Sequence, residues 1–583
     1  MSPPAVLRAA PATVPAGRRP PRIHRRRTSL FARGEPFVWL AGGALVLAAG
    51  MIAGLLLLVL YRGGATFWPR PLDEFRLLDG SVVLGEVAAR ESHRLAAHEI
   101  ESLAPAVRAR LREARGESSR TLVRTGNFEL TDTHFRWVED HLVAAHDRPE
   151  WALTVERMAW GRFYGTPRAY RVDGETVAVG PAAAWSAFAA DHGGALARGR
   201  ERRRLEKDGL GRLNQEIEAC RLAVRAAELE HGPGSSEHAR AQGELADKER
   251  DVERQAAAIR ARIAALEAEN ARCELVLSTA DGEEKALPPA EIVRAYPANR
   301  LDLAGKLSIY ASRGWEYLTA APREANSEGG VFPAIFGTVA MTFLMSVVVV
   351  PFGVLAALYL REYARQGIVV SLVRIAVNNL AGVPSIVFGV FGLGLFCYIV
   401  GASIDQLLFA ANLPNPTYGK GGILWASLTL ALLTLPVVIV ATEEALAAVP
   451  SSMREGSYAC GATKWQAIRR IVLPRAAPGI MAGAILAIAR GAGEVAPLMV
   501  VGAVKLAPAL PIDGRAPFLH PERSFMHLGF HIYDLGFQSQ NSEAAKPMVY
   551  TTTLLLIAIV VLLNLAAIRV RARLRRKFHG VAF

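Results

Sequence analysis

Two charged residues, Arg490 and Glu494, interrupt a long apolar stretch in the last fifth of the chain. They are four positions apart, so a helix would carry them on one face. Charges inside apolar helices are costly and normally face a bundle interior or a water-filled path. An arginine there could offer two parallel N–H donors to a passing oxyanion, with Glu494 positioning it. The spacing equally suits a mutually neutralising pair that only fixes helix packing.

A second candidate site lies at residues 451–474, where the sequence carries the signals of two short helices. Ser452 and Glu455 have the spacing of a capping box, which predicts a helix that starts near Met453. Gly461 suits the left-handed position that ends such a helix. The first helix is therefore expected to end at this glycine.

A second capping box, Thr463 with Gln466, follows directly and predicts a new helix from Lys464. Pro474 is expected to stop this helix after Leu473. Helical spacing also predicts an apolar stripe of Trp465, Ile468 and Val472. Local sequence alone thus favours two short helices joined at a glycine, as a structured loop on a membrane surface.

Six apolar segments are long enough to cross a bilayer of roughly 30 Å and so to hold these sites. We place them near residues 37–60, 332–360, 375–400, 421–442, 476–503 and 548–568. The first is expected to be a retained helix, because its apolar run exceeds that of a typical signal peptide and no A-x-A cleavage site follows.

Basic residues beside these spans set the expected orientation, because they favour the cytoplasmic side. The arginine-rich N-terminus and the basic C-terminus are both predicted to be cytoplasmic, and residues 62–330 extracytoplasmic. This describes a multi-pass protein of the plasma (inner) membrane. The same clusters explain much of the net charge of +13 without a nucleic-acid partner.

The expected fold class is mainly α: a polytopic helix bundle with a large extracytoplasmic insert of an α+β part and a helical hairpin. The expected organisation is a basic tail at 1–36, a first transmembrane helix at 37–61, an α+β region at 62–197, a hairpin at 198–275, a linker at 276–330 and a five-span core at 331–575. The hairpin is predicted because apolar residues recur at alternating steps of three and four on both sides of Gly232-Pro233-Gly234. Its geometry excludes a disulfide between Cys220 and Cys273.

No catalytic or metal-binding constellation is expected. The four cysteines form no C-x-x-C pair or Cys/His cluster, and His134, His141 and His146 are irregularly spaced. A G-x-x-x-x-G-K-[ST] loop is also absent, so the chain cannot cradle nucleotide phosphates in the usual way. The sequence therefore predicts neither an enzyme nor a cofactor on this chain.

The 451–474 loop resembles the EAA loop of ABC importer permeases (E-A-A-x3-G-x9-I-x-L-P). The match has the full spacing, although Gly456-Ser457 replace the two alanines. In that family the loop forms coupling helices that dock into a cleft on a separate ATPase subunit. The resemblance therefore predicts an ATPase-coupling loop whose residues include Glu455, Gly461, Trp465, Ile471, Leu473 and Pro474.

Residues 330–575 resemble one branch of these permeases, the PstA-type phosphate permeases. Three motifs carry the resemblance: Ala381–Gly389, Thr442–Leu446 and Ala489–Leu498, in which Val495 replaces the usual threonine. The resemblance implies a type I importer permease that translocates inorganic phosphate along a path including Arg490 and Glu494. It also implies a PstC-type partner permease, a PstB-type ATPase dimer that binds ATP and Mg²⁺, and a PstS-type extracytoplasmic phosphate-binding protein.

Two other functions remain open at this point. The imported anion could be another oxyanion, such as molybdate or sulfate. The chain could also be a membrane-anchored sensor or scaffold that acts through its external coiled coil, although one or two spans would suffice for that role. Apart from Trp315-Glu316-Tyr317-Leu318 just before the second span, the long insert inherits nothing from the resemblance.

Overall fold

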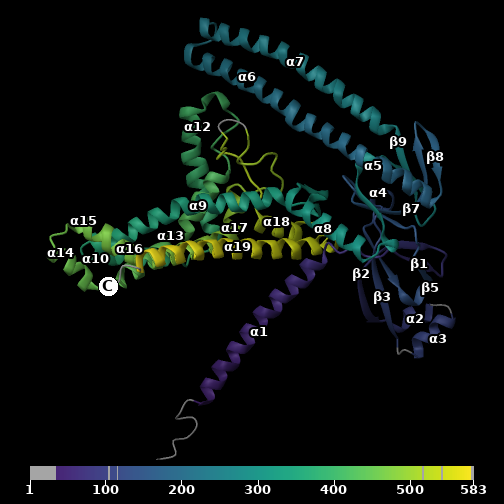
Figure 1. Ribbon diagram of the computed structural model, residues 1–583, viewed down its shortest axis with the longest axis horizontal. Coiled ribbons are helices and arrows are strands. Elements are labelled where there is room, and N and C mark those ends of the chain that lie inside the picture. Colours follow the sequence, from purple (N-terminus) through teal and green to yellow (C-terminus); the bar gives the residue numbers. More distant parts are fainter. Residues whose placement is uncertain (1–34, 103–104, 114–115, 515–517, 540–541, 580–583) are drawn as a thin grey trace, which may run out of the picture. The chain divides into compact units, whose positions relative to one another are not determined.

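The computed structural model describes residues 35–102, 105–113, 116–514, 518–539 and 542–579 (Figure 1). The chain forms two units, residues 1–58 and residues 59–583. Helix α1 (Glu35–Ala65) begins in the first unit, and its last turns belong to the second. The basic tail predicted at 1–36 lies outside the described residues as far as residue 34.

Within the described part of the chain, six helical segments are long and apolar enough to cross a membrane. They match the six predicted spans in number and order. The segments are Phe37–Ala65, Phe332–Tyr363, Ser385–Leu408, Ile423–Ala447, Lys464–Gly493 and Ser542–Arg573. Their main helices are α1, α9 (Phe332–Leu358), α11 (Ser385–Gly392), α13 (Ile423–Ala447), α16 (Leu473–Gly493) and α19 (Ser542–His579).

The third span begins at Ser385, so the predicted start near residue 375 was wrong. The apolar residues before it form a separate short helix, α10 (Ile368–Leu380). Pro384, with φ −55° and ψ 137°, stands between the two helices. Proline lacks an N–H and disfavours the helical region for the residue before it, which accounts for the interruption between the two helices.

The fifth span also differs from the prediction, because α16 ends at Gly493 and not near residue 503. Glu494 is extended (φ −76°, ψ 138°), and a short helix, α17 (Ala496–Val501), follows. Glycine is a poor helix former, and Pro497 suits the first turn of a new helix. The apolar run therefore continues while the helix does not.

Small residues bring the fourth and fifth spans close together. A Cβ on Gly479 would lie 2.4 Å from the Cβ of Ala445, and one on Gly483 would lie 2.6 Å from that of Ala441. Backbones of membrane helices approach closely where such small residues face each other. Around this contact the bundle has a buried core from several spans, including Met341, Met345, Leu430, Val438 and Ala487.

The insert, residues 62–330, contains a five-stranded antiparallel sheet of order β4-β3-β2-β1-β5. Alternate apolar side chains of its strands, such as Phe75, Val83 and Val123, form a small buried core. The strands are β1 (Asp73–Leu77), β2 (Val82–Arg94), β3 (Glu117–Arg124), β4 (Phe135–Glu139) and β5 (Val143–Asp147). Two short helices, α2 (Ala97–Ser102) and α3 (Pro105–Glu113), lie between β2 and β3 in the chain.

A second antiparallel sheet has the order β10-β9-β7-β6-β11, and β8 pairs with β7. Its strands are β6 (Leu153–Arg157), β7 (Arg162–Val172), β8 (Glu175–Val179), β9 (Cys273–Ser278), β10 (Glu284–Leu287) and β11 (Ile292–Pro297). Residues 276–330 were predicted to be a linker. They instead supply β10, β11 and the second half of β9, which completes the sheet by pairing with β7.

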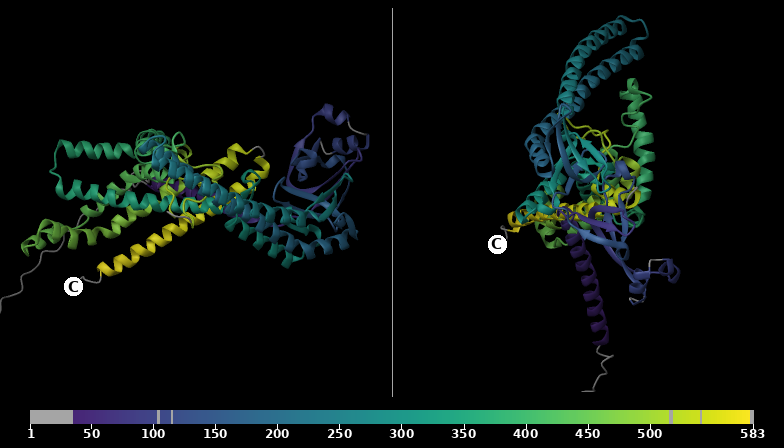
Figure 2. Two further views of the ribbon diagram at one scale, coloured as in Figure 1. Left: turned by 90° about the horizontal axis from the view of Figure 1, so that it is seen from above. Right: turned by 90° about the vertical axis from the view of Figure 1, so that its right-hand side faces the viewer.

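The predicted helical hairpin is an excursion between β8 and β9, and its two arms run side by side in Figure 2. The first arm begins at Pro181, upstream of the expected residue 198, because α5 (Pro181–Arg204) packs Phe188 onto the second sheet. A π-helical turn leads to α6 (Gly211–His231), and α7 (Ser236–Ala271) returns. Leu213 packs between Val252 and Ala256 in the seam, and Cys220 and Cys273 are free thiols.

Hydrogen bonds join the insert to the segment at 494–541. Asn326 Nδ2 donates to the carbonyl oxygen of Lys505 at 3.2 Å and to Asp534 Oδ2 at 3.1 Å. Lys505 Nζ lies 3.2 Å from Asp534 Oδ1. Four spans separate the insert from this segment along the chain, which puts both on one side of the bundle, and the contacts agree with this.

Candidate functional site

The 451–474 loop begins with a short helix, α14 (Ser451–Ala459), which ends as the sequence predicts. Gly461 has φ 81°, and its N–H donates to the carbonyl oxygen of Tyr458 at 2.9 Å. The next N–H, of Ala462, donates to Ser457 O at 3.1 Å. These two bonds form a Schellman motif that satisfies the last helical carbonyls.

The capping box predicted from Ser452 and Glu455 was wrong. Pro450 takes the N-cap position with φ −56° and ψ 139°, and no side chain caps the helix there. Because α14 already begins at Ser451, Ser452 lies inside the first turn and cannot act as the N-cap.

The second predicted capping box is confirmed at the start of α15 (Lys464–Ala467). Thr463 N–H donates to Gln466 Oε1 at 2.9 Å, and Gln466 N–H donates to Thr463 Oγ1 at 3.3 Å. The predicted stop at Pro474 was wrong, because the helix runs unbroken from Lys464 to Gly493. Pro474 lies in the first turn of α16, after a wider π-helical turn at Ile468–Val472, where a missing N–H is tolerated.

Arg454 fastens the loop to the ends of two spans. Its Nη1 donates to the carbonyl oxygen of Val449 at 2.6 Å, and its Nη2 donates to that of Leu446 at 2.8 Å. Both carbonyls lie at the C-terminal end of α13. Nη2 also contacts Glu362 Oε1 at 3.0 Å, and Glu362 follows α9. One guanidinium therefore fixes α14 to both helices.

The predicted apolar stripe divides between the inside and the outside of the loop. Ile468 and Val472 are buried against Leu358 and Leu446, so they hold the second helix to the bundle. Trp465 is 53% exposed, and Tyr458 of α14 is 42% exposed. Two large exposed aromatic side chains within eight residues of each other are typical of an interaction surface.

The remaining motif residues of the loop also fall into these two groups. Glu455 and Gly461 are exposed, whereas Ile471, Leu473 and Pro474 are half-buried. The structure thus places Glu455, Gly461 and Trp465 where a second protein can reach them. It places the other three where the helix joins the bundle.

Arg490 and Glu494 form the ion pair that their spacing predicts, with Arg490 Nε 3.4 Å from Glu494 Oε1. Glu494 is not on the helix, however, because α16 has ended one residue earlier. The side chains remain 35% and 20% exposed. The pair therefore lies at a break between α16 and α17, where it is reachable and only partly desolvated.

Two distant parts of the chain pack onto this break. A Cβ on Gly389 of α11 would lie 2.7 Å from Pro497 Cα. A Cβ on Gly529, in α18 (Leu528–Tyr533), would lie 2.7 Å from Val495 Cγ2. Two of the motifs that carry the family resemblance, Ala381–Gly389 and Ala489–Leu498, therefore meet in space.

Two positioning interactions were not found from the sequence. One is the Arg454 contact with the last carbonyls of α13, and the other is an ion pair of 3.3 Å between Arg374 Nε and Glu443 Oε1. A basic residue just after a helix C-terminus is a known signal for the first. The second joins residues far apart in the chain, and no local pattern indicates it.

In the part of the chain that the structure describes, no group of three or more His, Cys, Asp or Glu side chains could hold a metal ion. His146 instead contacts Asp73 in the first sheet, with 2.8 Å between Nε2 and Oδ1. His134 stacks on Phe128 with ring centroids 4.2 Å apart. These histidines have ordinary structural roles.

The chain has six candidate spans, and the helices α14 and α15 are fastened between the fourth and the fifth. This is the arrangement expected of a permease subunit of an ABC importer. Residues 349–580 match the family described as the inner membrane component of binding-protein-dependent transport systems. The phosphate transport system permease protein PstA of Mycobacterium leprae is 38% identical over 205 residues, which are 33% of this chain and 61% of that protein. PstA 1 of Mycobacterium tuberculosis H37Rv is 34% identical over 281 residues, 46% of this chain and 82% of that protein.

The chain belongs to this family and is a permease subunit of an ABC importer, not an enzyme. Its membrane part is of the PstA type. Among solved structures, an inward-facing MetNI methionine ABC transporter is 23% identical with a TM-score of 0.31, and the match covers 41% of this chain and 94% of that one. The sequence relatives align with less than half of this chain.

Proposed function

We propose that this subunit lines the path of inorganic phosphate into the cell. The observation that carries the proposal is the Arg490–Glu494 ion pair at the break between α16 and α17. Glu494 contacts the guanidinium through Nε, and the arginine fork suits the paired oxygens of phosphate. The PstA proteins to which the chain is similar are phosphate transport permeases by name, which supports this choice of anion.

The proposed orientation follows from the basic residues on the side of the 451–474 loop. Arg361 and Arg365 lie at the end of the second span, and Arg569, Arg571 and Arg573 lie near the end of the last. By alternation these ends share one side, and basic residues favour the cytoplasm. The loop and the C-terminus are then cytoplasmic, and the insert is extracytoplasmic.

The partners that we propose come from the similarity to PstA proteins. The exposed residues Glu455, Gly461 and Trp465 would dock onto a PstB-type ATPase dimer, which would bind ATP and Mg²⁺ and leave this chain without a cofactor. A PstC-type permease would complete the path. A PstS-type protein would deliver phosphate from the outside.

Uptake of phosphate into proteoliposomes that contain the complete transporter tests the role of Arg490. Arg490→Gln removes a charge-assisted contact of about 1.5–3 kcal/mol, which is roughly a 10- to 100-fold loss of apparent affinity. Arg490→Lys keeps the charge but loses the paired N–H donors of the guanidinium. Its apparent affinity for phosphate should therefore fall between those of the wild type and Arg490→Gln. Arg254→Gln, on a hairpin residue whose side chain is 80% exposed, is the matched control and should transport normally. Normal uptake by a correctly inserted Arg490→Gln variant would refute the role.

Competition by unlabelled anions tests the substrate in the same vesicles. Phosphate should suppress labelled phosphate uptake far below the concentrations at which sulfate or molybdate does. Stronger suppression by sulfate or molybdate would reassign the path to that anion. No uptake of any of the three would favour the sensor or scaffold function.

A further inference from the structure

A partly open cavity of about 500 Å³ lies between the insert, the end of α1 and the start of α19, separate from the Arg490 site. Its wall comes from the last turn of α1, from β2, β3, β4, β6 and β7, and from α8 (Leu303–Thr319). The segment from β12 (Pro322–Arg323) to β13 (Glu328–Gly329) and the first turns of α19 complete the wall. Sites for small organic ligands commonly have volumes of about 300–1,000 Å³. The cavity therefore has the size of a ligand site.

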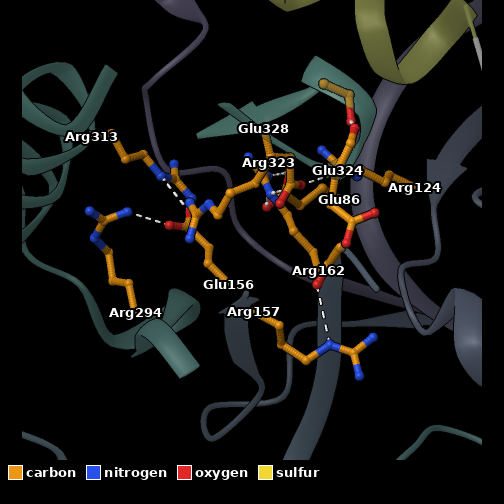
Figure 3. A network of polar contacts seen from close by, with 12 residues as sticks. Glu86, Arg124, Glu156, Arg157, Arg162, Arg294, Arg313, Arg323, Glu324 and Glu328 are labelled. Atoms are coloured by element: carbon orange, nitrogen blue, oxygen red, sulfur yellow. Dashed lines mark hydrogen bonds and ion pairs between the residues drawn. The ribbon is translucent and has the colours of Figure 1, made fainter. Parts of the chain in front are cut away.

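Many charged side chains line the wall, and Figure 3 shows the part of their network around Glu86, Glu156 and Glu328. Five glutamates and seven basic residues line the cavity. The five ion pairs are Glu86 with Arg162, Glu156 with Arg313, Glu316 with Arg323, Glu328 with Arg124, and Glu543 with Lys546. Arg294 adds a further cation to Glu316, at 2.9 Å. The glutamates are thus neutralised by these partners.

The buried carboxylates stay ionised within this network. Burial acts to raise the pKa of Glu156, but Arg313 and Arg294 outweigh it and hold the pKa at about 2. Burial acts on Glu86 in the same way, and Arg162 and Arg124 hold its pKa below the ordinary value. Both carboxylates therefore remain bound to their own arginines at neutral pH.

Two arginines on the wall take no part in these five ion pairs: Arg62 in the last turn of α1 and Arg70 shortly after it. Both are exposed, and within the described ranges neither makes an ion pair. Arg70 Nη1 donates to the carbonyl oxygen of Val87 at 2.6 Å, which orients its guanidinium. The cavity therefore carries an excess of two positive charges, and both belong to arginines.

We propose that this cavity binds a phosphate group through Arg62 and Arg70. Arginine forms bidentate, charge-assisted hydrogen bonds with phosphate oxygens, and a phosphate group with two negative charges would balance the excess. The site goes beyond the transport path, because neither Arg490 nor Glu494 lines it. The phosphate group has two possible sources, free inorganic phosphate or the headgroup of a phospholipid, since Arg62 ends a predicted membrane span.

Equilibrium binding to the purified full chain in a maltoside detergent tests the proposal, with inorganic phosphate and short-chain phosphatidylglycerol as separate probes. Saturable binding of inorganic phosphate that persists in Arg490→Gln assigns free phosphate as the ligand of the cavity, and binding of phosphatidylglycerol alone assigns a lipid headgroup. The Arg62→Gln/Arg70→Gln double variant should weaken binding by at least about tenfold, as expected for the loss of charge-assisted bonds. Arg62→Lys/Arg70→Lys keeps the two charges but loses the paired N–H donors of the guanidinium, so binding should weaken less.

Two control variants separate this site from the transport path and from general charge effects. Arg490→Gln should leave binding at the cavity unchanged while it impairs uptake. Arg254→Gln/Arg260→Gln removes two exposed hairpin charges outside the cavity and should also leave binding unchanged. The proposal is overturned if neither probe binds, or if the glutamine and lysine double variants bind like the wild type.

Discussion

Gly389→Ala is the most direct test of the packing that holds the proposed transport path. The added Cβ would lie 2.7 Å from Pro497 Cα and 3.1 Å from its carbonyl oxygen. Ordinary carbon contacts begin near 3.5 Å, so α11 and α17 would have to separate by roughly 0.8 Å. Both close atoms belong to the backbone, so no change of side-chain rotamer can relieve the contact. Overpacking of this kind costs about 1–3 kcal/mol.

The shift would also move the ion pair at the break, because Pro497 follows Glu494 by three residues. We therefore expect Gly389→Ala to lower both the temperature at which the detergent-solubilised protein loses its folded, monodisperse form and the rate of phosphate uptake. Gly394→Ala is the matched control, since a Cβ there has no neighbouring atom within 4 Å. Equal stability and equal uptake in the two variants would refute this account of the motif contact.

Three other predictions concern the loop, the hairpin and the insert. Arg454→Ala should sharply reduce ATP-driven uptake in vesicles without preventing insertion, because Glu362, whose side chain is 9% exposed, loses its cation; uptake at the wild-type rate would contradict this. Leu213→Ala should destabilise the hairpin by about 2–5 kcal/mol and speed its proteolysis, whereas Leu229→Ala, at a side chain 58% exposed, should not. Glu156 has its pKa lowered from 4.5 to about 2, so its charge stabilises the insert above pH 4.5, and this contribution is lost as the pH falls towards 2. Thermal unfolding against pH should show a weaker acid dependence over that window in Glu156→Gln than in the wild type.

The features that the sequence predicted correctly depend on neighbours along the chain. The capping box of Thr463 and Gln466 and the stop at Gly461 involve residues within one or two turns. The Arg490–Glu494 pair likewise needs only a spacing of four. The number of spans follows from apolar length alone.

Helix boundaries were less predictable, because hydrophobicity reports which residues avoid water and not where a helix ends. The breaks at Pro384 and after Gly493 lie inside apolar stretches. Pro474 was expected to be a stop, but the π-helical turn before it allows the helix to continue. Ser452 failed as a cap because Pro450 had already set the helix start.

Contacts between distant segments could not be read from the sequence. Strand β9 pairs with β7 across the whole hairpin, so residues that follow the hairpin belong to the sheet and not to a linker. The Arg124–Glu328 ion pair joins residues 204 positions apart. The arginine-lined cavity depends on several such pairs, and no local pattern indicates it.

The central claim is that the 451–474 loop couples this permease to an ATPase that drives phosphate import. The most direct measurement is the rate of ATP hydrolysis in proteoliposomes that contain the complete transporter, with and without the phosphate-loaded binding protein. We expect phosphate to stimulate hydrolysis with the wild-type chain, and the stimulation to disappear in Tyr458→Ala/Trp465→Ala, which truncates the two exposed aromatic side chains of the loop. Undiminished stimulation in that variant, or phosphate-stimulated hydrolysis without this chain, would contradict the claim.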